Sequence, residues 1–175
     1  MKTVFLKKVA IVVFTVVTMS VSAVAQQKGD MAAGGNLVIG TGNSFTNYGI
    51  GAKFLYNVTD PIRLAGEFDY FLKKDYLSMW DFSVYGHYLF PVAESVVVYP
   101  SVGLGLIGST VSMPTIDIPG MGTYGGSQSG SDFAFSLGAG ADYKLTSNLT
   151  LNGEIRIKMS NGTRFNLALG VAYKF

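Results

Sequence analysis

Residues 149–159 read LTLNGEIRIKM, and every second position of this stretch is apolar or glycine while the positions between are polar. The charged residues Glu154, Arg156 and Lys158 all fall in the polar set. Because successive side chains of a β-strand point to opposite faces, the stretch predicts a strand with one apolar and one polar face. Such strands are typical of a membrane-spanning β-barrel, which has lipid outside and a polar lumen within.

The same alternation runs from residue 47 to the last residue, Phe175, and a weaker form of it precedes residue 47. It predicts an all-β fold, namely an eight-stranded antiparallel up-and-down transmembrane β-barrel. Most of the segments have the roughly 9–11 residues that a tilted strand needs to cross a bilayer. We expect the strands at about 31–40, 47–57, 62–71, 79–89, 96–108, 132–144, 149–159 and 164–175.

The charged side chains of these strands all occupy the polar phase, so a barrel would hold them inside. We name ten of them the lumen network: Lys53, Arg63, Glu67, Asp69, Asp81, Asp142, Glu154, Arg156, Lys158 and Arg164. One interpretation is a plug of ion pairs, since a buried charge is costly without a partner. A gated ion path is the second interpretation. A cation held by Asp69 and Asp81 is the third.

A secreted soluble barrel around an apolar ligand would show the same alternation with the two faces exchanged. Three features favour the membrane interpretation. Small residues such as Gly103 and Gly105 occupy the polar phase, and they suit a lumen that is only wide enough for its own side chains. Aromatic residues of the apolar phase, such as Trp80 and Tyr143, gather near strand ends, where interfacial girdles lie. The chain also ends on an aromatic residue of this phase, Phe175.

The connections between the expected strands alternate in length. Segments 58–61, 90–94 and 146–148 each contain Asp, Asn, Pro or Ser, and they predict tight turns. Segment 109–131 is the longest connection, and we expect it to be an external loop, because outer-membrane barrels have short periplasmic turns and longer external loops. Its apolar residues suggest contact with an extracellular partner, with lipopolysaccharide or with the barrel mouth. A variable surface loop is the alternative.

Residues 1–25 have the features of a signal peptide: three lysines, an apolar stretch too short to span a bilayer as a helix, and an Ala-x-Ala site that ends at Ala25. We predict cleavage before Gln26 and one mature domain, residues 26–175. Without those three lysines the chain has ten basic and eleven acidic residues, which gives no electrostatic case for nucleic acid. The chain has no cysteine, so we expect neither disulfides nor a thiolate metal site.

From 26 to 175 the sequence resembles the small eight-stranded outer-membrane barrels of the OmpA/OmpX type, including porin-like β-barrel domains. The sharpest motif is the tail GVAYKF, in which Gly170, Tyr173 and Phe175 are similar to the C-terminal signal that this family presents to the outer-membrane assembly machinery. The family usually has a polar residue two positions before the glycine, and this chain has Ala168. The resemblance implies an integral outer-membrane protein of a Gram-negative cell, with lipid and lipopolysaccharide around it. No peptidoglycan-binding domain follows the barrel, so we do not expect the wall-anchoring role of longer relatives.

Two features could indicate an enzyme, and neither has the context that the chemistry needs. Residues 103–108 match G-x-G-x-x-G, but no helical pattern follows to receive a pyrophosphate. His87, the one histidine, precedes the 90–94 turn and lacks an H-x-S motif, so it could not act on outer-leaflet lipid. We expect no enzymatic activity, no cofactor and no metal. The expected role is structural or surface-interacting through the external loops; the alternative is a narrow porin-like channel for ions or very small solutes.

Overall fold

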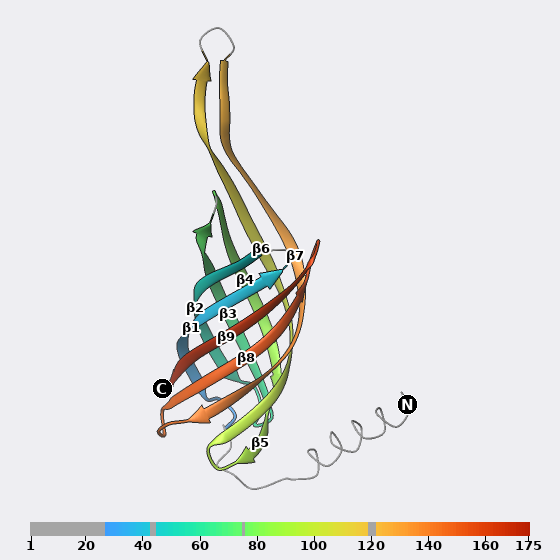
Figure 1. The fold of residues 1–175 in the computed structure, drawn as a ribbon. Helices are drawn as coiled ribbons and strands as arrows, with labels where there is room; N and C mark the ends of the chain where they lie inside the picture. The colour runs from blue at the N-terminus through green and yellow to red at the C-terminus, as the bar shows by residue number, and fades with distance from the viewer. Residues whose placement is uncertain (1–26, 43–44, 75, 119–121) are drawn as a thin grey trace, which may run out of the picture.

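The computed structural model describes residues 27–42, 45–74, 76–118 and 122–175, which form a closed antiparallel β-barrel (Figure 1). Its strands are β1 (Met31–Gly42), β2 (Phe45–Asn57), β3 (Ile62–Lys74), β4 (Leu77–Tyr88), β5 (Phe90–Ala93), β6 (Val96–Ile118), β7 (Gly122–Lys144), β8 (Leu149–Met159) and β9 (Thr163–Lys174). Strands β1 and β9 pair, as do β4 and β6, so the sheet closes on itself. The predicted eight-stranded up-and-down barrel is confirmed. The described residues include no helix that is long and apolar enough to cross a membrane.

Strands β4 and β5 are two parts of one barrel strand, so nine segments make eight barrel strands. Both pair with β6. The pairing with β6 is interrupted at Pro100, which has no N–H to donate. On the other side of the strand, the N–H of Leu89 donates to the carbonyl of Pro61 (2.7 Å), next to β3. The turn expected at 90–94 is wrong in its first part, because β5 occupies those residues and the chain turns at 94–95.

Apolar side chains cover the outside of the barrel and charged side chains line the inside. On β8, Ile155 is 63% exposed, whereas its neighbours Glu154 and Arg156 are 4% and 1% exposed. Small residues of the polar phase, such as Ala65 and Ala168, are buried in the lumen. A soluble barrel around an apolar ligand would need the opposite arrangement, so that alternative is wrong.

The two ends of the barrel differ. At the first, which we call the turn end, lie the turns at 58–61, 94–95 and 145–148 and the C-terminus (Figure 1). At the second, which we call the hairpin end, β6 and β7 continue beyond all the other strands (Figure 1).

The expected loop at 109–131 is wrong, because most of this segment is a β-hairpin. Strands β6 and β7 stay paired up to Ile118 and Gly122, and we call their part above the barrel, residues 112–118 and 122–131, the β6–β7 hairpin. Serine, threonine and glycine occupy both phases here, so the sequence lacks the contrast between apolar and polar positions on which strand prediction depends. The last support from the neighbouring strand is the N–H of Ser112, which donates to the carbonyl of Tyr76 (2.9 Å).

The two ends of the described chain are joined at the seam between β1 and β9. The N–H of Phe175 donates to the carbonyl of Met31 (3.1 Å), and Lys174 Nζ lies 2.7 Å from Asp30 Oδ2. The Lys174 side chain is 42% exposed, so this ion pair is solvated.

Candidate functional site

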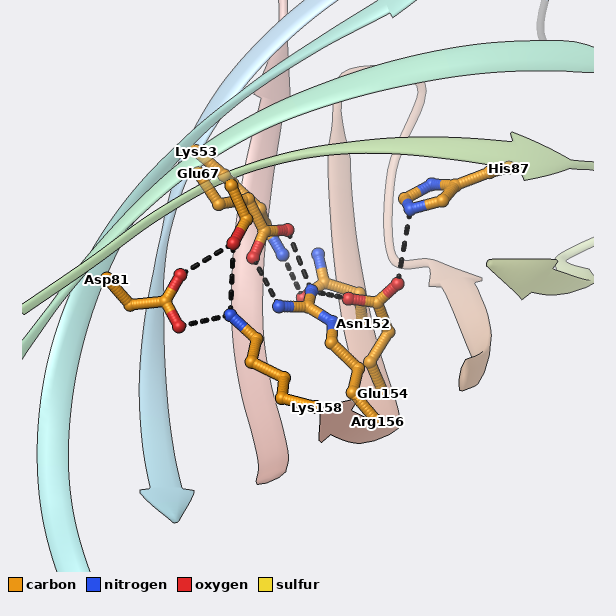
Figure 2. Close-up of polar contacts among 9 residues, drawn as sticks. Lys53, Glu67, Asp81, His87, Asn152, Glu154, Arg156 and Lys158 are labelled. Atoms are coloured by element: carbon orange, nitrogen blue, oxygen red, sulfur yellow. Dashed lines mark hydrogen bonds and ion pairs between the residues drawn. The ribbon is translucent and has the colours of Figure 1, made fainter. Parts of the chain in front are cut away.

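The centre of the lumen holds an arginine–glutamate pair from opposite walls of the barrel (Figure 2). Arg156 on β8 donates from Nη1 to Glu67 Oε2 (2.6 Å) and from Nη2 to Glu67 Oε1 (2.8 Å). The same guanidinium contacts Glu154 on its own strand and lies 4.2 Å from the ring centre of Tyr85. These charged side chains are at most 4% exposed. A two-point hydrogen bond of this kind is strong and directional, so it links β3 to β8 across the lumen.

Towards the hairpin end, Lys158 extends the network to β4 (Figure 2). Its ammonium pairs with Asp81 and also donates to Ser83 Oγ (3.1 Å). The Ser83 hydroxyl donates in turn to Asp81 Oδ1 (2.6 Å). The Asp81 carboxylate thus has a partner at each oxygen, so the three side chains form a closed polar unit.

Towards the turn end, Arg63 forms the second buried pair. Its Nη1 lies 2.5 Å from Asp142 Oδ2, and its guanidinium lies 4.6 Å from the ring centre of Tyr99. Lys53 donates to the amide oxygen of Asn152 rather than to a carboxylate. This part of the network therefore mixes ion pairs with amide and aromatic contacts.

His87 lies in the lumen, where it connects the two arginine pairs. The Nε of Arg63 donates to His87 Nδ1 (3.1 Å), which requires the neutral imidazole with its proton on Nε2. That nitrogen faces Glu154 Oε1 at 3.4 Å, and the ring stacks on Tyr99 with centroids 4.6 Å apart. The histidine is 3% exposed, so its place is that of a packed lumen side chain.

Three members of the lumen network are not brought into ion pairs within the described residues: Lys53, which donates to Asn152, and Asp69 and Arg164. Asp69 lies opposite Asp81 in the β3–β4 register, and its carboxylate occupies the space that a Cβ at Gly51 would fill. Arg164 lies near the rim, with its guanidinium 5.9 Å from the ring centre of Phe71. The third interpretation, a cation held by Asp69 and Asp81, has no support here, because Asp81 already binds Lys158 and Ser83.

An apolar layer closes the lumen beyond the charges, at the hairpin end. Its buried members are Val38, Phe71, Met79, Ile107, Ala134 and Ala168. Sequence reasoning missed this layer because it tested only whether charges enter the apolar phase. The signal was the converse: large apolar residues such as Phe71 and Met79 stand in the polar phase. Along the barrel axis, the lumen is therefore filled first by the charge network and then by this apolar layer.

The turn end, by contrast, opens into a vestibule. It is a cavity of about 500 Å³, with Arg63, Asp142 and Asn152 among its lining residues. Asp30 and Lys174 also line it. The charge network therefore forms part of the inner wall of this cavity.

Tyr85 and Tyr99 are lumen residues that sequence reasoning also missed. Each ring lies over a glycine of the adjoining strand: a Cβ added at Gly103 would meet Tyr85, and one at Gly140 would meet Tyr99. The signal was two large aromatic side chains in the polar phase, paired with glycines that leave them room. Because both rings also lie against guanidinium groups, they fill the lumen and hold its cations.

Comparison with known proteins gives the family. The model of the outer membrane protein beta-barrel domain matches residues 9–175. The chain belongs to this family. Membership in the outer membrane protein beta-barrel domain family, together with the fold, indicates location in the outer membrane.

Solved structures share the fold of this family member at low identity. The attachment invasion locus protein Ail of Yersinia pestis has a TM-score of 0.59 and 17% identity, over 85% of this chain and 100% of that one. Neisserial surface protein A has a TM-score of 0.62 and 16% identity, over 83% and 96%. OprG of Pseudomonas aeruginosa has a TM-score of 0.56 and 12% identity, over 88% and 99%. No curated protein sequence matches the chain. At these identities the similarities establish the fold alone.

The remaining predicted residues of this outer-membrane barrel lie at the chain ends. Tyr173 and Phe175 lie on the outer surface, 56% and 66% exposed, and the Phe175 ring lies 6.4 Å from that of Phe54. Gly170 lies beneath the side chain of Asn36. The predicted cleavage site, between residues 25 and 26, lies outside the described residues.

Proposed function

We propose that this outer-membrane barrel has a structural and surface-contact role, carried by the β6–β7 hairpin. The observation that carries this proposal is the closed lumen. Three ion pairs join side chains across it, and an apolar layer lies beyond them. A narrow apolar constriction excludes water and therefore ions. The hairpin, in contrast, lies outside the barrel wall, and Met113, Pro114 and residues 126–131 are exposed.

The alternative is a narrow channel for ions or very small solutes. One observation favours it: the vestibule already leads from the turn end to Arg63, so a channel would need only the network and the apolar layer to move. Such a movement must break buried ion pairs, which resist the loss of one partner. We therefore place the channel second.

We further propose that the hairpin end faces the outside of the cell and the turn end faces the periplasm. Short turns on one side and the long extension on the other support this orientation. Lipid would surround the apolar outer face, and lipopolysaccharide would surround the rim at the hairpin end. We propose export by a cleaved signal peptide and recognition of Gly170, Tyr173 and Phe175 by the assembly machinery. No catalytic role is proposed, because the single histidine is packed against Arg63 and Tyr99 at the far end from the outer leaflet.

Planar-bilayer recording of the refolded mature chain tests the closed lumen. We expect a folded barrel that is electrically silent. Reproducible conductance steps that change when Glu67 or Arg156 is neutralised would instead support the channel. Folding is checked in the same sample by the different gel migration of boiled and unboiled protein.

Cysteine labelling of intact cells tests the orientation, because the natural chain has no cysteine to interfere. We expect a membrane-impermeant maleimide to label Ser129→Cys on intact cells. Ser147→Cys, in the turn between β7 and β8, should be labelled only after the outer membrane is opened. The reverse pattern would place the hairpin in the periplasm and end the surface-contact proposal.

A further inference from the structure

The outer edge of β7 has no partner strand where β7 leaves the barrel. Strand β8 ends at Met159, which lies opposite Phe135, so within the described residues no strand pairs with this edge from residue 134 up to Gly122. An unpaired edge presents a row of N–H and C=O groups that another strand can join. Side chains at 126–132 are all exposed. Asn161 Nδ2 donates to Asp132 Oδ1 (2.6 Å) at the lower end of this edge, and no strand of the described chain lies beside the backbone of residues 126–131.

The two edges of the hairpin are protected to very different degrees. On β6, pairing with the neighbouring strand continues to Ser112, and above it stand Pro114 and a bulge between Met113 and Ile116. Proline, which has no N–H, and a bulge are the devices by which proteins prevent edge pairing. On β7, residues 126–132 read GSQSGSD, with no proline and no lysine, and they pair with β6 without a register shift. Only the β7 edge is therefore open to strand addition.

The open edge is complementary to itself in the antiparallel sense. If two copies pair about a twofold axis at Ser129, each Ser127 lies opposite Ser131 and each Gln128 opposite Gly130. The serines at 127, 129 and 131 then face one another on one side of the sheet, and Asp132 lies opposite Gly126, so no two charges meet. Cross-strand hydroxyl pairs stabilise such ladders, and the β6–β7 pairing already has two of them, Thr110–Ser129 (3.0 Å) and Ser112–Ser127 (3.4 Å).

The orientation of the barrel in the membrane determines in which membrane the second copy must lie. All copies in one membrane have β7 running in the same direction, so two β7 edges related by rotation about the membrane normal can pair only in parallel, which is the less stable arrangement. Antiparallel pairing of β7 with the β6 of a neighbour is blocked by Pro114 and the bulge. A copy in a facing membrane presents its β7 in the opposite direction, as antiparallel pairing requires.

We propose that the β7 edge at residues 126–132 pairs with the same edge of a second copy in an opposing membrane, so that the protein forms a homotypic contact between two cells. This inference rests on the proposed surface-contact function and names its partner. The interface is isologous, since each copy contributes the same residues. One pair of short edges binds weakly, but many copies on two surfaces act together, and their avidity greatly exceeds the single affinity.

Vesicle aggregation with exchanged charges tests the proposal. The full mature chain is reconstituted in phosphatidylcholine vesicles, its outward-facing fraction is determined by protease access to the hairpin, and aggregation is followed by light scattering. We expect wild-type vesicles to aggregate. Ser129→Asp vesicles and Ser129→Lys vesicles should each stay dispersed, because like charges meet at the twofold axis. A mixture of the two should aggregate again, since each contact then joins opposite charges.

Thr110→Asp serves as the matched control. It adds the same charge to the same face of the ribbon, but on β6, so two copies of it would lie about 14 Å apart, beyond the distance over which salt at 0.15 M leaves charges interacting. This variant should aggregate like the wild type.

Dispersed wild-type vesicles with outward hairpins would overturn the proposal, as would Ser129→Asp vesicles that aggregate like the wild type or a mixture that stays dispersed. These failures are distinct from failure of the proposed function. Surface labelling of Ser129→Cys together with an electrically silent barrel would leave the surface-contact role intact with a different partner.

Discussion

Glu67 and Arg156 lie 89 residues apart in the chain, yet they meet in the centre of the lumen through two hydrogen bonds of 2.6 and 2.8 Å. Glu67 lies on β3 and Arg156 on β8, two strands that are not neighbours in the sheet. The pair therefore links opposite walls of the barrel across the lumen, in addition to the backbone hydrogen bonds that join neighbouring strands around the barrel. Its surroundings are balanced, since the lumen network has five cationic and five carboxylate residues.

Removal of one partner of this pair should be strongly destabilising. We expect Glu67→Ala to lower the free energy of unfolding by about 3–5 kcal/mol, because Arg156 would keep a buried and poorly compensated charge. Urea titration of the barrel in lipid vesicles, followed by tryptophan fluorescence, measures this change. Lys174→Ala is the control: it breaks an exposed ion pair with Asp30 and should cost about 0–1 kcal/mol. Equal losses in the two variants would show that the central pair contributes no more than a surface contact.

The two closures of the lumen should act independently. Phe71→Ala opens a hole in the apolar layer, and Arg156→Ala removes the central cation, but each leaves the other closure in place. We expect both single variants to be electrically silent in planar bilayers and the double variant to give conductance steps, provided that gel migration shows a folded barrel. A conducting Arg156→Ala single variant would mean that the apolar layer does not seal the lumen.

Strand positions and facing directions could be predicted from the sequence, because alternation depends only on the two-residue period of a strand. The side of the barrel wall on which Arg156 or Lys158 lies follows from that period. Their partners do not, because alternation leaves open how far each strand is shifted along its neighbour and which way a long side chain leans. Asp81 binds Lys158, whereas Asp69, its neighbour across the register, finds no cation within the described residues.

The β6–β7 hairpin shows where the pattern stops giving information. Beyond Ser112 the backbone pairing continues outside the barrel wall, where no lumen requires one face of the ribbon to be polar and the other apolar. The apolar layer escaped prediction for another reason. The inward-facing positions were expected to be polar along the whole of each strand. Phe71 and Met79 show instead that the inward positions nearest the hairpin end can be large and apolar.

Glycines that face the lumen should be less replaceable than those that face lipid. A methyl group at Gly103 would overlap the ring of Tyr85, so Gly103→Ala should lower the free energy of unfolding by about 1–3 kcal/mol. The matched control is Gly66→Ala on the outer face, where a Cβ meets nothing within 4 Å and the change should be neutral or slightly stabilising. Urea titration of both variants in vesicles checks the difference. If both substitutions cost the same, the space at Gly103 is not what the structure indicates.

The tip of the β3–β4 connection carries local backbone strain at Tyr76, whose φ is 68°. A residue with a Cβ is destabilised by roughly 1–2 kcal/mol in this left-handed region. Glycine is not destabilised there, and asparagine is destabilised less. Because the Tyr76 side chain is 54% exposed, little packing is lost on replacing it. We therefore expect Tyr76→Gly to raise the free energy of unfolding by about 1 kcal/mol, measured by urea titration. Tyr76→Ala keeps the Cβ and separates the two contributions: it should give no gain, and a gain as large as that of glycine would show that the tyrosine side chain, rather than the backbone angle, is the source of the cost.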